Sequence, residues 1–136
     1  MKPILISIKP KFTEKIYSGT KTIELRRSVG KNFVRGSEVF IYSSSPVKAI
    51  TGKARIEKVE TKLVSDILKE NLQNAAISAS ECEEYFTGKK FGYLIWLEQL
   101  QILDKPVSLH LMRLAGVTAP QSFCYIDEPI RDALCL

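Results

Sequence analysis

Hydrophobic positions follow two different periods along the chain, one typical of strands and one typical of short helices. Apolar residues alternate with a period of two over residues 3–9, 22–26 and 39–42, and each segment predicts a strand. Between the first two segments, residues 11–18 carry an apolar stripe at helical spacing, and Gly19 follows as the residue that ends the helix. The first third of the chain therefore predicts strand, helix, strand and strand.

The next segment predicts a long strand followed by two helices. Residues 47–59 are mostly β-branched or alternating, and Gly52 within them indicates a bulge or a bend. Helical periodicity then covers residues 62–72 and 79–87, and the second helix begins with the capping-box pattern Ser78-Ala79-Ser80-Glu81. We expect both helices to pack outside the sheet, away from any functional site.

The last segment predicts a central strand and one more short helix. Residues 91–102 form the most apolar stretch of the chain, which is typical of a strand covered on both faces. After Pro106, Ser108 is placed to cap a helix that ends at Gly116. Periods of two and 3.6 in this order predict an α+β fold with a mixed sheet.

The size and composition of the chain favour one compact unit. It has 136 residues, of which 45% are hydrophobic and 26% charged, and this is the composition of a globular protein. Two domains would each be too small to bury a sufficient core. We therefore expect a single domain over residues 1–136.

Positive charge is concentrated in the first half of the chain. Residues 1–59 contain thirteen lysines or arginines and four glutamates, a net charge of +9, whereas residues 60–136 contain seven cations and eleven carboxylates, a net charge of −4. A localised basic region is the electrostatic feature that nucleic-acid-binding proteins share. The alternative is that the excess lysine only keeps the protein soluble.

Cysteine and histidine usage argues against several classes of site. Cys82, Cys124 and Cys135 are odd in number and share no C-x-x-C spacing, so neither a disulfide framework nor a cysteine zinc site is expected. The single histidine excludes a multi-histidine metal site, and no phosphate-binding or dinucleotide-binding glycine motif occurs. We expect no metal, no cofactor and no membrane partner, and a cytoplasmic location.

The strand at residues 22–26 carries charge on one face. Ile23 and Leu25 point one way, whereas Glu24 and Arg26 point the other and are neighbours on that face. Lys21 joins this polar group only if it belongs to the turn before the strand, which we expect. The alternative is that Glu24 and Arg26 form an ordinary exposed ion pair, worth less than ~1 kcal/mol.

A serine-rich turn closes the strand at residues 39–42. Its sequence is Ser43-Ser44-Ser45-Pro46, and such a turn can bind a phosphate or carboxylate, although most serine turns only hydrogen-bond internally. Together with the charged strand and nearby cations, it defines the candidate binding residues, which are Lys9, Lys21, Glu24, Arg26, Arg27, Ser43, Ser44 and Ser45.

The spacing Gly19-x-Lys21-x-x-Glu24-x-Arg26 resembles the ASCH family of the PUA-like superfamily. The order of elements around it, from residue 4 to the Ser-Ser-Pro turn, strengthens the resemblance, which extends to the Pro106 region. It implies a curved mixed sheet that closes toward a small barrel, with short helices packed outside. It also implies binding of RNA or a modified nucleoside or nucleotide, in a regulatory role related to transcription or translation.

The resemblance leaves an enzymatic alternative open. One ASCH branch is similar to amidohydrolases that deacetylate N4-acetylcytidine with a lysine, a threonine and a glutamate. Lys21 matches the lysine, but Glu24 stands at the threonine position and Asn74-Ala75-Ala76 stands where the glutamate would fall. Another branch is ribonuclease-like. If the chain is an enzyme, Lys21 and Glu24 are the candidate catalytic residues, because a lysine beside a carboxylate can perform acid–base chemistry.

Overall fold

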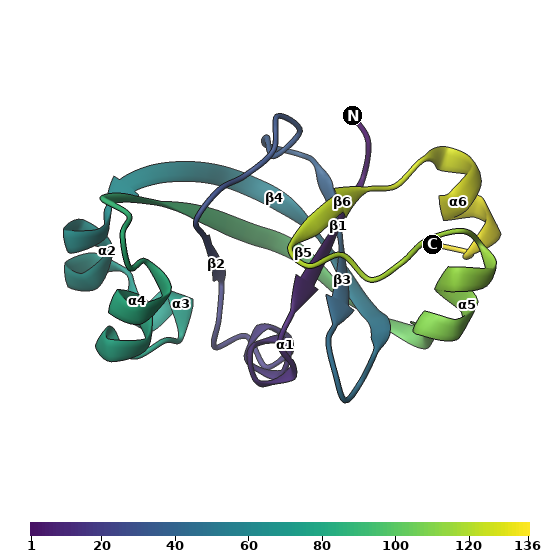
Figure 1. Cartoon of the computed structure of the whole chain (residues 1–136), viewed down its shortest axis with the longest axis horizontal. Coiled ribbons are helices and arrows are strands. Elements are labelled where there is room, and N and C mark those ends of the chain that lie inside the picture. Colours follow the sequence, from purple (N-terminus) through teal and green to yellow (C-terminus); the bar gives the residue numbers. More distant parts are fainter.

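The computed structural model describes residues 1–136 as a curved mixed sheet with short helices at its two ends and one helix against its middle (Figure 1). In chain order its elements are β1 (Ile4–Ile8), α1 (Pro10–Tyr17), β2 (Ile23–Arg26), β3 (Glu38–Ser43), β4 (Ala49–Leu63), α2 (Val64–Glu70), α3 (Leu72–Ala75), α4 (Ala79–Tyr85), β5 (Phe91–Ser108), α5 (Leu109–Leu114), β6 (Phe123–Tyr125) and α6 (Glu128–Ala133).

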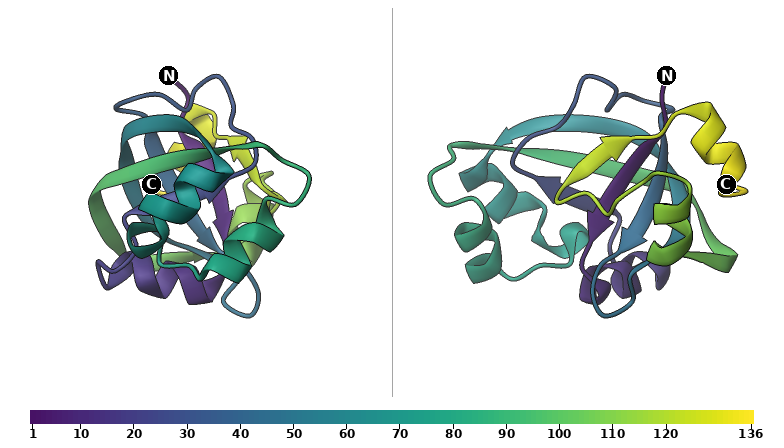
Figure 2. Two further views of the ribbon diagram at one scale, coloured as in Figure 1. Left: turned by 90° about the vertical axis from the view of Figure 1, so that its left-hand side faces the viewer. Right: turned by 45° about the vertical axis from the view of Figure 1, so that its right-hand side comes forward.

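The six strands form one sheet in the order β2-β5-β4-β3-β1-β6. β1 is parallel to β3, and every other neighbouring pair is antiparallel. The sheet curls into a half-barrel whose two edges are β2 and β6 (Figure 2). The predicted α+β fold with a curved, mixed sheet is therefore confirmed.

The long antiparallel pair of β4 and β5 produces much of this curvature. Their register shifts at three places, between Ile50 and Gly52, between Lys53 and Arg55, and between Ile56 and Lys58. Such irregularities bend a strand and increase its twist. At Gly52 a Cβ atom would lie 2.6 Å from the Tyr17 hydroxyl of α1, so the absent side chain also lets α1 pack closely against the bend.

β1 is buried on both faces because two separate apolar clusters meet there. Ile4, Ile6 and Ile8 pack with Ile16 of α1 inside the curve of the sheet. Leu5 packs on the opposite face in a second cluster, which α5 and α6 cover. Burying one such side chain contributes about 1.5–3 kcal/mol, so β1 anchors both layers of the fold.

A third apolar cluster lies under the helices α2, α3 and α4. Ile23 and Leu25 of β2 pack there with Ile67, Cys82 and Phe86. The alternation predicted for this strand is thus confirmed, since its apolar face points to the helices. Its charged face points to the inside of the half-barrel.

The boundaries near residue 63 differ from the prediction. β4 continues to Leu63, and the single helix expected over residues 62–72 is instead the short α2 followed by α3. Pairing with β5 reaches Leu63 opposite Phe91, so sheet hydrogen bonds override the local helical pattern. The capping box of α4 is confirmed, because the Ser78 hydroxyl accepts a hydrogen bond from the Glu81 amide at 3.1 Å.

None of the helices has both the length and the apolar character needed to cross a lipid bilayer.

Candidate functional site

A cavity of about 610 Å³ opens between the two edges of the half-barrel. Its lining comes from the end of β1, from β2, from the turn after β3, and from the chain just before β6. The helices α4 and α5 border it on either side (Figure 1). This volume lies within the range of ~300–1,000 Å³ that small-molecule sites usually have.

Glu24 and Arg26 form a buried ion pair inside this cavity. Arg26 donates to Glu24 Oε2 through Nε at 2.9 Å and through Nη2 at 2.6 Å. The two side chains are only 11% and 9% exposed. The alternative of an ordinary exposed pair is therefore wrong, because the curl of the sheet encloses a face that the strand pattern alone leaves open.

The remaining donors of Arg26 join β2 to β1 and to the chain just before β6. Nη2 donates to the Ser7 carbonyl of β1 at 2.7 Å, and Nη1 donates to Ser122 Oγ at 3.2 Å. Glu24 is its third partner, so all three nitrogens of the guanidinium donate to protein groups. Arg26 therefore positions Glu24 and closes the seam between β2 and β1.

Lys21 lies in the turn before β2, as predicted, and its ammonium is almost completely buried. Nζ donates to the Ala75 carbonyl at 2.7 Å, lies 3.6 Å from Glu24 Oε1, and sits 5.1 Å from the centre of the Phe12 ring. Burial lowers the pKa of Lys21, and attraction to Glu24 opposes this effect in part. Of the three N–H groups of the ammonium, only the one that donates to Ala75 has a hydrogen-bond acceptor in the protein, so a donor is available to a ligand in the cavity.

Glu24 Oε1 is the one carboxylate oxygen in the cavity that accepts no hydrogen bond. Both Arg26 bonds go to Oε2, and the Lys21 ammonium is too distant from Oε1 for a hydrogen bond. Every fully buried side-chain nitrogen or oxygen atom has a hydrogen-bond partner. Because Oε1 has none, it is not fully buried, and it is accessible from the cavity that Glu24 lines. We call Lys21, Glu24 and Arg26 the buried charge cluster.

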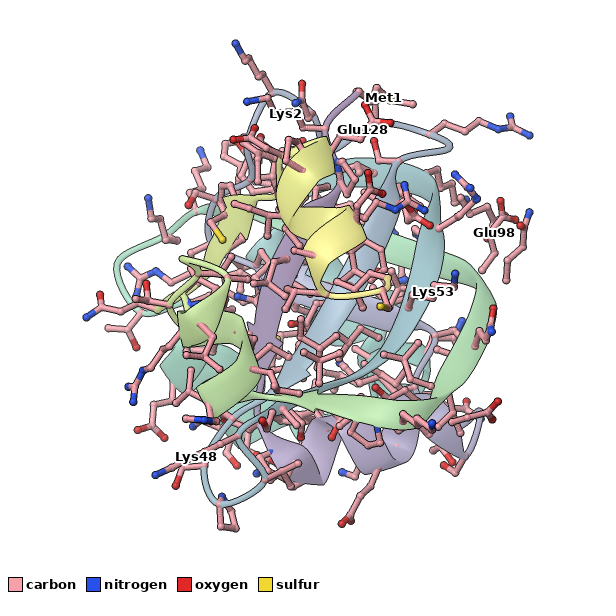
Figure 3. The ribbon with its side chains drawn as sticks, turned by 90° about the vertical axis from the view of Figure 1, so that its right-hand side faces the viewer. Met1, Lys2, Lys48, Lys53, Glu98 and Glu128 are labelled. Carbon is pink, nitrogen blue, oxygen red and sulfur yellow. The ribbon has the colours of Figure 1, made fainter.

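Three further cations line the cavity without any carboxylate partner. They are Lys9 at the start of α1, Lys48 in the turn between β3 and β4, and Arg113 of α5, and all three are exposed. The Lys48 side chain extends into solvent below α5 (Figure 3). Lys48 is held beside α5 because its carbonyl accepts from the Leu109 amide at 2.9 Å. We call these three residues the cationic rim.

Tyr42 adds a hydroxyl group to the same side of the cavity. It is a buried residue of β3, and burial raises its pKa while the nearby Arg113 opposes that rise. Ser44 and Ser45 of the predicted serine turn also line the cavity, and the Ser44 amide donates to the Ile8 carbonyl at 3.0 Å. Hydroxyl donors and cations thus occur together at the rim.

Six of the eight predicted binding residues line the cavity, and two do not. The six are Lys9, Lys21, Glu24, Arg26, Ser44 and Ser45. Ser43 is instead buried against Thr13, with 3.0 Å between the two hydroxyl oxygens. Arg27 is exposed outside the cavity and donates weakly to the Tyr85 carbonyl at 3.4 Å.

Several cavity residues that the sequence did not predict come from distant segments. Tyr42, Lys48 and Arg113 carry no local motif, and only the fold brings them to the predicted residues. The expectation that the helices over 62–72 and 79–87 lie away from the site is wrong in part, because Tyr85 of α4 lines the cavity, together with Ile77 from the turn before α4. Lys15 and Lys21 hold the chain next to Ile77, since they donate to the carbonyls of Ala76 and Ala75.

No group of three or more histidine, cysteine, aspartate or glutamate side chains is arranged to hold a metal ion.

Comparison with known proteins places the chain in a family. Residues 1–118 match the profile of the family described as "Domain of unknown function (DUF365)". The chain belongs to this family.

Relatives of this DUF365 member include a protein from Zymomonas mobilis. The ASCH domain-containing ribonuclease of that bacterium is 28% identical over 129 residues, which cover 93% of this chain and 86% of the relative. The crystal structure of ASCH from Zymomonas mobilis matches with a TM-score of 0.90 and 26% identity, over 98% of this chain and 94% of that one. The resemblance to the ASCH family is therefore confirmed.

A more distant structure shows the breadth of the fold. Human THYN1, solved in complex with DNA that contains 5-methylcytosine, matches with a TM-score of 0.59 and 14% identity over 99% of this chain and 96% of that one. This likeness concerns the fold alone.

The structure also shows how the site departs from the amidohydrolase pattern. At Asn74-Ala75-Ala76, where that pattern places a glutamate, the chain supplies backbone carbonyls to two lysines instead. The carboxylate beside Lys21 comes from Glu24, at the position of the threonine. Two of the three side chains of that pattern are thus replaced by groups of different chemistry.

Proposed function

We propose that this DUF365 member binds single-stranded RNA, or a nucleotide with a modified base, in the cavity between β1 and β2. The observation that carries the proposal is the charge of the lining, which contains five cationic side chains and one carboxylate. The three cations of the rim have no protein partner and are available to phosphates. The relative that is named as a ribonuclease supports a nucleic-acid ligand.

Single strands suit this cavity better than duplexes. It is a concave site with apolar wall residues such as Phe12 and Ile77, and an unstacked nucleotide can enter it. Proteins read single-stranded RNA by splaying its bases out of the stack, whereas duplexes keep their bases inside. The proposal therefore predicts a preference for unpaired RNA.

The experiment is a salt titration of binding to a labelled, mixed-sequence, single-stranded RNA, followed by fluorescence anisotropy. Affinity is expected to fall with salt at a log–log slope of roughly −0.7 per neutralised phosphate. Lys48→Ala removes one contact, and Lys69→Ala on the distant α2 is the matched lysine control. Absence of binding, or binding that salt does not change, would show that the cavity has another ligand.

A second candidate function is RNA cleavage in the same cavity. The observation that favours it is the meeting of the Tyr42 hydroxyl, Lys48 and Arg113 on one side of the cavity, in a chain 28% identical to a ribonuclease. In metal-independent RNA cleavage, the 2′-hydroxyl loses its proton and attacks the adjacent phosphorus. The bond to the 5′-oxygen breaks, that oxygen takes up a proton, and a 2′,3′-cyclic phosphate results.

The cationic rim can stabilise the charge that develops on phosphorus, and Tyr42 can transfer a proton. Gel analysis of a labelled RNA is the test, and a substrate with 2′-deoxyribose throughout is the control. Tyr42→Phe is expected to reduce the cleavage rate by about 10²-fold or more and to leave binding intact. Equal cleavage of the deoxy substrate would contradict this route. Release of acetate from N4-acetylcytidine would identify the amidohydrolase alternative instead.

A further inference from the structure

The polar groups at the bottom of the cavity determine which hydrogen-bonding groups a ligand must carry. Lys21 offers one N–H donor, and Glu24 Oε1 offers an acceptor, with 3.6 Å between the two atoms. Both side chains are more than nine-tenths buried, so water is largely excluded from them. Leaving such groups without partners under a bound ligand costs about 1–3 kcal/mol each, and more for charged groups.

Neither a phosphate nor a free cation can pair with both Lys21 and Glu24 Oε1. A phosphate oxygen placed near Lys21 would also face Glu24 Oε1, which lies 3.6 Å from the ammonium, and the two negative charges would repel each other. A cation placed near Glu24 would face both Lys21 and Arg26. The complementary group is neutral and carries an acceptor directly beside an N–H donor.

The surroundings of the pair favour a flat, aromatic carrier of that group. Phe12, Ile77 and Tyr85 line the cavity near it, and Phe12 approaches the Lys21 ammonium. The Tyr85 ring is held by an edge-to-face contact with Phe86, with 4.9 Å between the ring centres. A ring between such walls gains apolar contact while its edge reaches the charges.

We propose that Lys21 and Glu24 together bind the hydrogen-bonding edge of one nucleobase, with Lys21 donating to its acceptor and Glu24 Oε1 accepting from its N–H. The phosphate of the same nucleotide lies at the cationic rim. This inference rests on the proposed function, because it assigns one RNA unit to the cavity. Arg26 is a positioning residue here, since it fixes the oxygen that the base does not use.

The first measurement compares the four nucleoside 5′-monophosphates with ribose 5-phosphate by calorimetry. Base recognition predicts that at least one nucleotide binds ten or more times more tightly than ribose 5-phosphate, which keeps the phosphate and lacks the base. Similar affinities for all five compounds, or no binding of any nucleotide, would overturn the inference.

The second measurement removes the N–H donor from the tightest-binding nucleotide. The counterparts are 3-methyluridine, 1-methylguanosine, N6,N6-dimethyladenosine and N4,N4-dimethylcytidine, each as the 5′-monophosphate. Loss of the donor is expected to weaken binding at least tenfold. A methyl group on C5 of a pyrimidine or C8 of a purine, which leaves every N–H donor in place, is the control, and it is expected to change affinity less than threefold. Equal losses from both methylations would show that the cavity senses bulk alone.

The protein-side test is Glu24→Gln. Arg26 holds the amide oxygen of the glutamine, so the amide NH₂ takes the place of Oε1 and offers a donor where the base needs an acceptor. The tenfold preference for the unmethylated nucleotide is expected to fall below threefold. Full preference in this variant would contradict the role of Glu24.

Failure of this inference is distinct from failure of the proposed function. Salt-dependent binding of single-stranded RNA that Lys48→Ala weakens but base methylation does not change would leave the RNA proposal intact and overturn base recognition. Absence of RNA binding would overturn the proposed function itself.

Discussion

The two sets of charges that line the cavity differ in what they contact. In the buried charge cluster, the Arg26 guanidinium and one Glu24 oxygen are bound to protein groups, and the side chains are at most 11% exposed. In the cationic rim, no side chain has a carboxylate partner and all are exposed. Charged residues at one site therefore have different roles, and burial decides which role each one has.

This difference changes what a substitution at each place should do. A charge inside the cluster is compensated by its neighbours, so its removal leaves another charge buried without a partner. A charge at the rim is hydrated, so its removal changes only what the protein can bind. Substitutions in the buried charge cluster should therefore lower the free energy of unfolding, whereas substitutions in the cationic rim should change the salt-dependent affinity for RNA.

The largest expected effect is the loss of stability in Arg26→Ala. Glu24 would keep only the distant Lys21 as a charged partner, and the Ser7 carbonyl would lose its donor. We expect the free energy of unfolding to fall by about 3 kcal/mol in urea denaturation. Arg113→Ala is the matched arginine control and is expected to change stability by less than about 0.5 kcal/mol. Equal stabilities for the two variants would erase the distinction between cluster and rim.

The next effect is on RNA affinity in the double variant Lys48→Ala, Arg113→Ala. Removal of two phosphate contacts is expected to make the salt slope for single-stranded RNA shallower by about 1.4. Urea denaturation should show unchanged stability, because neither side chain forms an ion pair. An unchanged slope would show that phosphates bind elsewhere on the basic half of the chain.

The smallest effect is a pH dependence of stability that comes from Lys21. Burial lowers its pKa in the folded state below the ordinary value of 10.5, so just below pH 10.5 the unfolded chain binds more protons. Stability contributed by this group should therefore rise with pH in that range. The unfolding free energy of the parent minus that of Lys21→Met should therefore increase as the pH is raised from 8 to 10.5. A flat difference would show that Lys21 titrates as it does in water.

The sequence predicted the charged face of β2 but left open whether that face lies in a groove or in water. Alternation of Ile23 and Leu25 with Glu24 and Arg26 defines the two faces of the strand without any tertiary information. It does not say whether the polar face meets water. The half-barrel encloses that face, and the exposed ion pair considered from the sequence becomes a buried one.

The cavity residues from distant segments could not be predicted from the sequence for a related reason. Lys48, Ile77 and Arg113 belong to three separate segments, and no local spacing connects them to Lys21. Likewise, the helical pattern near residue 62 yields to sheet pairing, because Leu63 finds a partner in Phe91 of β5. Contacts between distant segments depend on how the elements pack together. A periodic pattern in the sequence describes each element separately and does not show which elements meet.

What the sequence determined by itself is the class of the fold, the order of most elements and six of the cavity residues, because the direction of side chains along a strand or helix follows from backbone geometry. The tertiary structure alone decided which charges are buried and bonded and which remain free. The physical reason is that the cost of burying a charge depends on all the groups around it. For Glu24 those groups are Lys21 and Arg26, and the curl of the sheet encloses them.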